Sequence, residues 1–422
     1  MKKRWNYSWV IVAICFLSVA ISLGFCSSGR TMYLTAITDA LKIPRSTFSL
    51  TETFRFCTTT VLNMFFGSLI AKFGPKKLRS AGFICLVGFA VVSANAETLW
   101  GFYAAAILLG IGLSWTGTTM MGTVVNVWCT ENKGAITGAI LCANGLGGAI
   151  SAQILSPIIF KEGEPFGYRS SYWLVAAILF VMLVLILIFF KDRPKGSEGA
   201  ITVKKKGARR GAGWTGMDYR EAIRKPYFYL ALAAMTLTGM SLQGLAGIAT
   251  PHMYDLGLDK DFVALVMTFS SIVLMGSKFF IGFLCDRLGV RRVTNVCLAC
   301  SFLSLIGLVA LTNTPLGRGI AFGRVIFNAI AMPLETVMIP LLASELFGDK
   351  SFAKILGFFS AASSAGFALG APFANLCYDL FGSYNLPFVV FALLMVFVTV
   401  SLQIVFKKAS RDRAALEVIT EE

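Results

Sequence analysis

Charged residues are scarce in this chain of 422 residues. Asp, Glu, Lys and Arg make up 14% of it, whereas hydrophobic residues make up 56%. A typical soluble domain carries about 25% charged residues, because polar side chains must cover its surface. The composition therefore excludes an ordinary soluble domain and indicates a protein whose main solvent is lipid.

Histidine is scarcer still, since His252 is the single copy. With no second imidazole to share an ion, a metal site is not expected. The sequence also shows no pair of nucleophile and base and no phosphate-cradling loop, so an enzyme is the least favoured function and no cofactor is expected. The ten cysteines lie in or beside apolar segments, where buried thiols are expected in place of disulfides.

Twelve apolar segments, six in each half of the chain, are long enough to cross a bilayer. A helix needs about 20 residues to span the hydrocarbon core, and most of the segments reach that length. The predicted spans are 8–33, 47–71, 80–96, 99–127, 133–159, 171–190, 226–252, 262–285, 293–312, 317–346, 352–378 and 385–406. The predicted fold is an all-α membrane protein with twelve transmembrane helices in two pseudo-symmetric six-helix bundles.

The basic residues are unevenly distributed among the loops. The chain has 38 Lys and Arg against 22 Asp and Glu, which gives a net charge of +16. On a soluble protein this charge would suggest nucleic acid. Here 28 of the 38 fall in the termini and in alternate loops, as cytoplasmic loops of membrane proteins require. We therefore predict cytoplasmic termini and no nucleic-acid partner.

The same reasoning divides the chain into four parts. We expect an N-terminal six-helix bundle at 1–190, a basic cytoplasmic linker at 191–225, a C-terminal six-helix bundle at 226–408 and a cytoplasmic tail at 409–422. The linker combines basic residues with glycines, so it is expected to be flexible and to touch anionic lipid headgroups.

Two short segments, one in each half, match at a constant offset of 215 residues. Each follows an apolar span, carries two glycines and ends in basic residues before another span begins. The matched positions are Gly67 with Gly282, Ala71 with Asp286, Lys72 with Arg287 and Gly74 with Gly289. Such a repeat predicts two related halves.

Lys278 lies within the predicted eighth span. A lysine at the centre of a bilayer costs about 2.5 to 3.5 kcal/mol on insertion scales, so its default interpretation is functional. No acidic residue lies one turn away, because position 274 is leucine and position 282 is glycine. An unpaired buried cation attracts an anion. The alternative is an ion pair with a carboxylate on another helix, such as Glu335.

The first two spans contain three more charges. Arg30 lies late in the outward-running first span, and Glu52 and Arg55 lie early in the inward-running second, so their depths are similar. Glu52 and Arg55 can pair at i,i+3, or Glu52 can neutralise Arg30, with no substrate involved. Tyr33, one turn from Arg30, and Asn63, the repeat equivalent of Lys278, are candidate polar lining residues.

The tenth span carries Arg324 and Glu335, which are eleven residues apart, about three helical turns. They share one face with Asn328 between them. These residues either line a cavity or brace neighbouring helices.

Taken together, the duplicated loop, the twelve spans, the basic linker and the segment 128–138 resemble the major facilitator superfamily. The resemblance runs from about Tyr7 to Lys408. It makes the two loops candidate gating motifs, with Gly67, Gly74, Gly282, Asp286, Arg287 and Gly289 as their residues. The first copy departs from the family, because Ala71 stands where an aspartate is usual.

Within the superfamily, residues 278–282 resemble the eighth span of the monocarboxylate transporters and the bacterial oxalate:formate antiporters. In that group an arginine four residues before the glycine binds the substrate carboxylate, and Lys278 occupies its position. Arg30 likewise matches a functional lysine of the monocarboxylate transporters. Leu274 stands where that group tends to have an aspartate linked to proton coupling. Glu52 or Glu335 would have to serve instead.

The sequence therefore predicts a secondary transporter that moves a small organic anion, a mono- or dicarboxylate, by alternating access. Protons or a counter-anion are candidate co-substrates, and the resemblance implies a monomer in a bacterial inner membrane. The alternatives are an exporter of lipophilic or drug-like compounds and a non-transporting carboxylate sensor. Candidate substrate-binding residues are Lys278, Arg30, Tyr33, Asn63 and Asn328, and candidates for proton coupling or ion pairing are Glu52, Glu335, Arg55 and Arg324.

Overall fold

The computed structural model describes residues 7–28, 30–43, 45–129, 132–160, 166–192 and 216–421. Within these ranges every named element is a helix, and the one β-type contact is an isolated bridge between Gly216 and Gly348. This confirms the predicted all-α class. Helices dominate because hydrocarbon cannot hydrogen-bond to the backbone, so each spanning segment must satisfy its own N–H and C=O groups.

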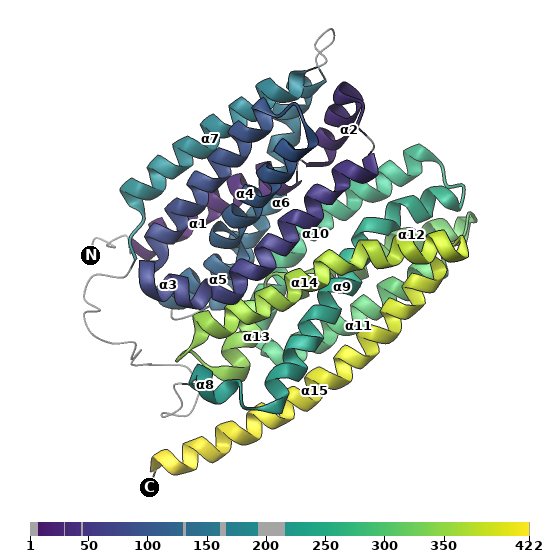
Figure 1. The fold of residues 1–422 in the computed structure, drawn as a ribbon. Coiled ribbons are helices and arrows are strands. Elements are labelled where there is room, and N and C mark those ends of the chain that lie inside the picture. The colour runs from purple at the N-terminus through teal and green to yellow at the C-terminus, as the bar shows by residue number, and fades with distance from the viewer. Residues whose placement is uncertain are drawn as a thin grey trace, which may run out of the picture. The chain divides into compact units, whose positions relative to one another are not determined.

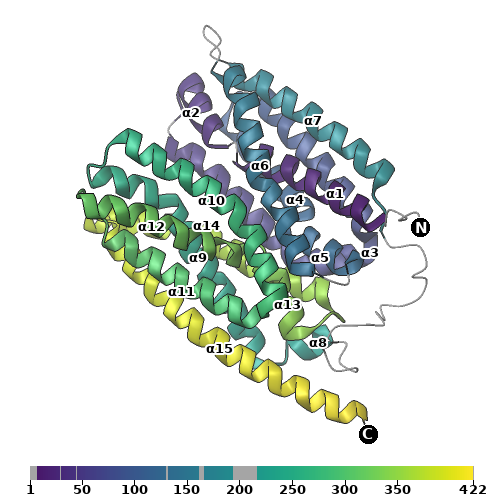
Figure 2. The same cartoon turned by 180° about the vertical axis from the view of Figure 1, so that it is seen from behind.

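The chain divides into two compact units (Figures 1 and 2). Unit 1 comprises residues 1–131 and 139–197, and unit 2 comprises residues 132–138 and 198–422. Unit 1 contains α1 (Tyr7–Val19), the π-helix η1 (Ala20–Ser28), α2 (Arg30–Leu41), α3 (Arg45–Asn95), α4 (Leu99–Thr116), α5 (Thr118–Trp128), most of α6 (Lys133–Ile159) and α7 (Gly167–Phe189). Unit 2 contains the first turns of α6, α8 (Tyr219–Ala222), α9 (Pro226–Asp255), α10 (Lys260–Leu288), α11 (Val290–Val309), α12 (Pro315–Ala331), the 3-10 helix η2 (Met332–Glu335), α13 (Met338–Phe347), α14 (Phe352–Phe381) and α15 (Asn385–Glu421).

The helices supply the twelve predicted spans. Ten helices are long and apolar enough to cross a membrane, and the bent pair Pro315–Glu335 and Met338–Phe347 adds an eleventh. One of the ten, Leu50–Asn95, is 46 residues long, about twice what a bilayer requires. Gly74 interrupts it with φ 79° and ψ 162°, so this helix forms two spans.

The sequence repeat reappears in the backbone. Gly74 has φ 79° and ψ 162°, and its predicted equivalent Gly289 has φ 87° and ψ 148°. A residue with a side chain rarely adopts such a positive φ, so glycine is required at both turns. Each turn directs the chain from one span into the next, which agrees with the prediction of two related halves.

Helix packing repeats in the same way. In unit 1, a Cβ atom on Gly147 of α6 would lie 2.0 Å from the carbonyl oxygen of Ala20. In unit 2, a Cβ atom on Gly366 of α14 would lie 2.1 Å from the carbonyl oxygen of Thr236 in α9. In each unit a glycine on the fifth membrane span therefore allows close contact with the backbone of the first span of that unit. Small residues have this role at membrane helix interfaces.

Two helices extend beyond the predicted spans. The first span was predicted to end at residue 33, but α2 continues to Leu41. The twelfth was predicted to end near residue 406, but α15 continues to Glu421. In the second case polar contacts hold the extension, because the Asp412 carboxylate accepts a hydrogen bond from the Tyr227 hydroxyl and lies 2.8 Å from the Lys225 ammonium. Hydropathy alone does not detect a helix that leaves the apolar zone.

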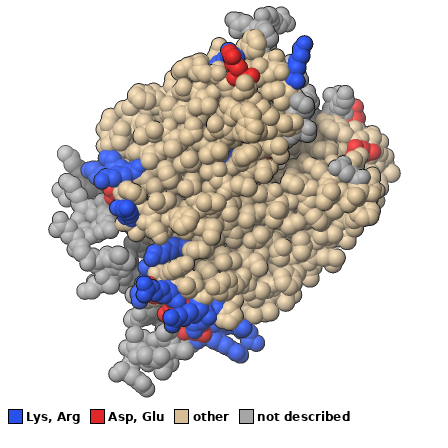
Figure 3. All heavy atoms as spheres, in the orientation of Figure 1, with Lys and Arg blue, Asp and Glu red and all other residues tan. Residues whose placement is uncertain are grey.

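The surface is largely apolar, as a lipid-facing protein requires. Large hydrophobic side chains such as Phe65, Trp173 and Leu393 are more than half exposed. Figure 3 shows a wide uncharged surface, with Lys and Arg gathered near the α8 end of unit 2. The exposed basic residues of unit 2 at this end include Arg220, Arg224, Lys350, Lys354, Lys407 and Lys408. We call this end, where the linker enters unit 2, the linker side.

The close contact between α9 and α14 yields a prediction about stability. Gly366→Ala would place a methyl group against the Thr236 carbonyl oxygen, so we expect a loss of about 1 to 3 kcal/mol and a clearly lower melting temperature. Gly276→Ala is the matched control, because a Cβ atom on this helical glycine would meet nothing within 4 Å. Thermal unfolding of the purified variants in detergent measures both, and equal melting temperatures would contradict the packing described here.

Candidate functional site

Lys278 of α10 is buried within unit 2, with 9% of the residue exposed. Its ammonium group lies within electrostatic range of the Glu335 carboxylate on η2. Glu335 is the residue that the alternative interpretation of Lys278 named as a possible ion-pair partner on another helix. The two residues are 57 positions apart in the sequence, and they meet because α10 packs against η2.

Glu335 ends the short 3-10 helix η2, where the tenth span breaks. The axes before and after this break differ by 51°. Only 7% of Glu335 is exposed, and its Oε1 atom has no hydrogen-bond partner among the described residues. Broken helices inside a membrane are tolerated where the freed polar groups line a cavity or meet a ligand. The break therefore marks a place for polar chemistry in unit 2.

Arg324 of α12 is buried in unit 2, with 5% of the residue exposed. Its Cβ and Cγ atoms pack close to Gly307 of α11, where a Cβ atom would lie 3.3 Å from the Arg324 Cβ. Its Nε and Nη1 atoms have no hydrogen-bond partner within the described part of the chain. Buried polar groups are nearly always satisfied, so an arginine with two free N–H groups is suited to bind an anion.

Asn328 lies one turn beyond Arg324 on the same face of α12, as predicted. It is 9% exposed, and its Oδ1 atom has no partner among the described residues. Arg324, Asn328 and Glu335 thus form a row of buried polar groups along the tenth span, each with at least one unsatisfied atom.

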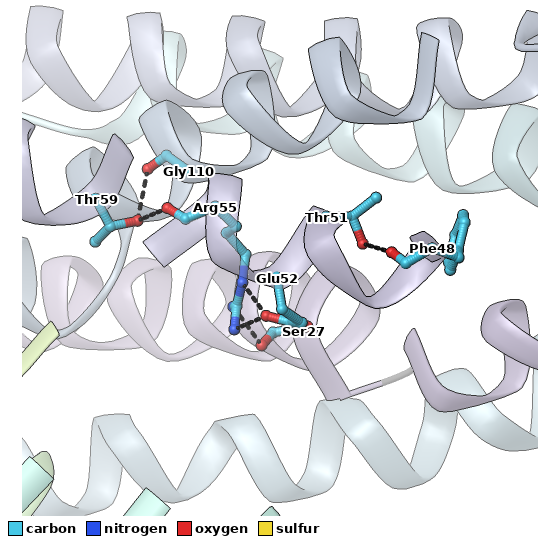
Figure 4. Close-up of polar contacts among 7 residues, drawn as sticks. All are labelled: Ser27, Phe48, Thr51, Glu52, Arg55, Thr59 and Gly110. Atoms are coloured by element: carbon cyan, nitrogen blue, oxygen red, sulfur yellow. Dashed lines mark hydrogen bonds and ion pairs between the residues drawn. The ribbon is translucent and has the colours of Figure 1, made fainter. Parts of the chain in front are cut away.

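In unit 1, Glu52 and Arg55 pair with each other (Figure 4). The Arg55 Nη2 and Nε atoms lie 2.6 Å and 2.7 Å from the Glu52 Oε2 atom, and Nη1 donates to the Ser27 hydroxyl at 3.2 Å. This is the i,i+3 pair that the sequence offered as one alternative. The Glu52 side chain is 40% exposed, so solvent weakens the pair.

The other predicted site residues of unit 1 have partners inside that unit. The Tyr33 hydroxyl lies 2.6 Å from the Ser171 hydroxyl, and its ring stacks on Tyr172 at 4.2 Å between centroids. The Asn63 Oδ1 atom accepts a hydrogen bond of 2.7 Å from the Ser114 hydroxyl. Arg30 begins α2, and its side chain lies outside the described part of the chain.

The second gating motif contacts the start of α6. The two carboxylate oxygens of Asp286 accept hydrogen bonds from the Gly134 and Ala135 N–H groups at 2.9 Å and 2.7 Å. An aspartate at this place satisfies free N–H groups and complements the helix dipole. Gly282 allows the approach, since a Cβ atom there would lie 2.2 Å from the Gly134 carbonyl oxygen. Arg287 is exposed and lies over the Phe283 ring.

The first gating motif uses a residue that the sequence did not reveal. Gly67 is buried within α3, and Ala71 replaces the usual aspartate. Asp192, just after α7, instead accepts a hydrogen bond of 2.6 Å from the Lys76 N–H group, two residues past Gly74. No motif spacing signals this contact, because the two residues are 116 positions apart.

Arg79 is a second residue that sequence reasoning missed. It follows the basic loop at Lys76 and was counted with the loop charges, yet it is completely buried in unit 1. Its Nη1 atom lies 3.2 Å from the Cys15 Sγ atom, and its guanidinium packs over the Phe190 ring at 4.9 Å. Sulfur and aromatic groups stabilise this cation in place of a carboxylate.

Comparison with known proteins agrees with this fold. The family model of the Major Facilitator Superfamily matches residues 12–251 and 232–419. An uncharacterised MFS-type transporter, YcxA of Bacillus subtilis (strain 168), is 25% identical over 414 residues and covers 95% of each chain.

Other relatives differ in the substrates that their names state. The sialic acid transporter NanX of Escherichia coli (strain K12) is 25% identical over 63% of this chain and 62% of its own. Monocarboxylate transporter 12-B of Danio rerio is 22% identical over 73% of this chain and 68% of its own. Further relatives of similar identity carry the name Multidrug resistance protein MdtG.

A solved structure shares the fold at low identity. The proton:xylose symporter XylE matches 95% of this chain and 96% of its own with a TM-score of 0.73 and 11% identity. Since the family model covers nearly the whole chain and both the full-length relative and the solved structure agree with it, the chain belongs to the Major Facilitator Superfamily and is a multi-pass membrane transporter.

Proposed function

We propose that this secondary transporter moves a small organic anion, a mono- or dicarboxylate, across the membrane. The observation that carries the proposal is the charge balance inside unit 2. Among its described membrane-spanning side chains, Lys278, Arg324 and Glu335 are the buried residues with formal charge, which are two cations and one anion. A net positive charge in a low-dielectric interior favours an anionic ligand.

In this mechanism the anion makes closure easier. Bare cations in a closed site must give up water without compensation, whereas a bound carboxylate replaces that water and cancels the excess charge. Binding would thus lower the free-energy cost of the closing step that alternating access requires. In unit 1, Arg30 would supply a further cation, and Tyr33 and Asn63 would be polar lining residues.

Glu335 is the acid best suited to couple protons to transport. It is buried, interacts with Lys278, and leaves one carboxylate oxygen without a partner among the described residues. Glu52 is less suited, because Arg55 already holds it as an ion pair. A proton on Glu335 would release the positive charge of Lys278 for a second anionic group, which suits symport, while exchange would use a counter-anion.

The relatives are named for different substrate classes, so we use the buried charges of unit 2 to choose between these classes. NanX and monocarboxylate transporter 12-B are named for substrates that carry a carboxylate, whereas MdtG is named for drug resistance. An exporter of lipophilic cations would require an excess of buried acid. In unit 2 the described buried charges show the opposite excess, which favours the carboxylate over the drug-like alternative.

The distribution of basic residues supports a placement in the membrane. Lys and Arg gather on the linker side of unit 2 (Figure 3), and cytoplasmic faces carry this excess. We therefore propose that the linker side and both termini face the cytoplasm, with a bacterial inner membrane as the location.

The first prediction of the proposed function concerns the substrate class. Proteoliposomes containing the purified protein are expected to accumulate radiolabelled carboxylates, drawn from lactate, pyruvate, formate, oxalate and succinate. Lys278→Gln is expected to reduce uptake at least about tenfold, because it leaves the buried Glu335 carboxylate without its counter-charge. Uptake with and without a pH gradient separates symport from exchange.

A matched control keeps this test specific. Glu97→Gln changes an exposed acid whose partner, Arg169, lies 3.5 Å away near the surface, so uptake is expected to stay near the wild-type rate. If the wild-type protein moves none of the carboxylates, or if a lipophilic cation is exported in their place, the proposed function is wrong.

The second prediction concerns Asp286. Asp286 and the first turn of α6 that it holds both belong to unit 2, whereas the rest of α6 belongs to unit 1, so we expect this contact to take part in the transport cycle. Asp286→Ala removes two charge-assisted hydrogen bonds and is expected to lower the maximal uptake rate about tenfold or more. Asp286→Asn keeps one acceptor and should have a smaller effect. Equal rates for Asp286→Ala and the wild type would exclude this role.

A further inference from the structure

We propose that Arg324 and Asn328 form the carboxylate-binding subsite of unit 2 and that the substrate is a small hydroxycarboxylate. The inference rests on the proposed function, which it refines in two respects. It moves the carboxylate contact from Lys278 to Arg324, and it narrows the substrate to carboxylates that carry a hydroxyl group.

Lys278 is poorly placed to hold the carboxylate alone, because a buried carboxylate already lies within electrostatic range of it. Its ammonium group interacts with the Glu335 carboxylate inside unit 2. A buried pair of opposite charges has little net attraction for a third ion, and an anion near Lys278 would also approach Glu335. The formal charges of Lys278 and Glu335 sum to zero, so the two residues together offer an anion little net attraction.

Arg324 retains its charge. None of the ion pairs found among the described residues involves its guanidinium. On α11 its neighbour is Gly307, which has no side chain that could serve as a partner. His252 of α9 lies within electrostatic range but directs its Nε2 atom to the Leu308 carbonyl oxygen at 3.1 Å. The positive excess of unit 2 is thus located on Arg324.

The chemistry of this guanidinium suits a carboxylate. Its Nε and Nη1 groups are both unsatisfied in the described structure. Either of them can form a fork with Nη2 that binds the two oxygens of a carboxylate. An arginine that only braced helices would direct these donors to carbonyl or carboxylate oxygens. Here the donors remain free although only 5% of the residue is exposed, which a bound anion would explain.

Asn328 indicates which functional group the substrate carries beside its carboxylate. Residues at i and i+4 on a helix have Cβ atoms about 5 to 6 Å apart, so a small molecule held by Arg324 reaches Asn328. The unsatisfied Asn328 Oδ1 atom is an acceptor and requires a donor. A hydroxyl group next to the carboxylate provides that donor, whereas an unsubstituted fatty acid would leave Oδ1 buried and unpaired.

Binding measurements on the full-length protein test the carboxylate contact separately from transport. Equilibrium binding of radiolabelled lactate is measured for the wild type, Arg324→Gln, Arg324→Lys, Lys278→Gln and the double variant Lys278→Gln/Glu335→Gln. We expect Arg324→Gln to raise the Kd by about 50-fold or more and Arg324→Lys by about tenfold, because lysine keeps the charge but loses the paired donors.

The double variant separates the two cations. Lys278→Gln alone is expected to weaken binding, because Glu335 then stands as an uncompensated anion. Removing both charges should restore lactate binding to within about threefold of the wild type, even if transport is lost. Weak binding by the double variant together with wild-type binding by Arg324→Gln would overturn the inference and return the carboxylate to Lys278.

A pair of matched ligands tests the hydroxyl contact. Lactate and propionate differ by one hydroxyl group, and we expect the wild type to bind lactate at least about tenfold more tightly. Asn328→Leu should bring the ratio of the two Kd values close to one, while a variant that is merely damaged would weaken both ligands equally. Equal binding of lactate and propionate by the wild type would refute the hydroxyl contact. Failure of the wild type to bind any carboxylate would instead refute the proposed function.

Discussion

Every charge buried in this protein must be compensated from within the chain or by a ligand, because hydrocarbon cannot solvate it. The same constraint acts on the backbone and produces helices whose hydrogen bonds are satisfied internally. Glycine occupies the two turns, at Gly74 and Gly289, where φ is positive. It also occupies the closest helix contacts, at Gly147 and Gly366, where a side chain would collide with the neighbouring backbone. The polar residues that remain are few, and each requires a specific partner.

The buried cations satisfy this requirement in three different ways. Arg55 is held by Glu52 and Ser27, and Arg79 is surrounded by sulfur atoms and an aromatic ring. Lys278 of α10 lies within electrostatic range of the Glu335 carboxylate on η2. Arg324 has none of these solutions among the described residues, and its position beside a broken helix is where transporters bind their substrates. A missing partner is thus as informative as a contact.

Local features of the sequence were sufficient for the fold. Apolar length predicts the spans, and a glycine followed by basic residues predicts the two turns, because both depend on neighbours along the chain. The partners of charged residues were less accessible. Glu52 and Arg55 are one turn apart and were predicted to pair, whereas Asp192 and Lys76 meet only through packing. Arg79 resembled a loop residue because burial depends on helices that are distant in sequence.

The two gating loops have diverged although their backbones still match. The second holds the start of α6 with a carboxylate and two N–H groups, while the first has Ala71 at the equivalent position and borrows Asp192 from within its own unit. Both contacts use a carboxylate, but they differ in the helix that they hold and in the number of hydrogen bonds, so the states that they stabilise differ in free energy. Such a difference sets which state the empty carrier occupies more often, while the direction of net transport still follows the gradients of its substrates.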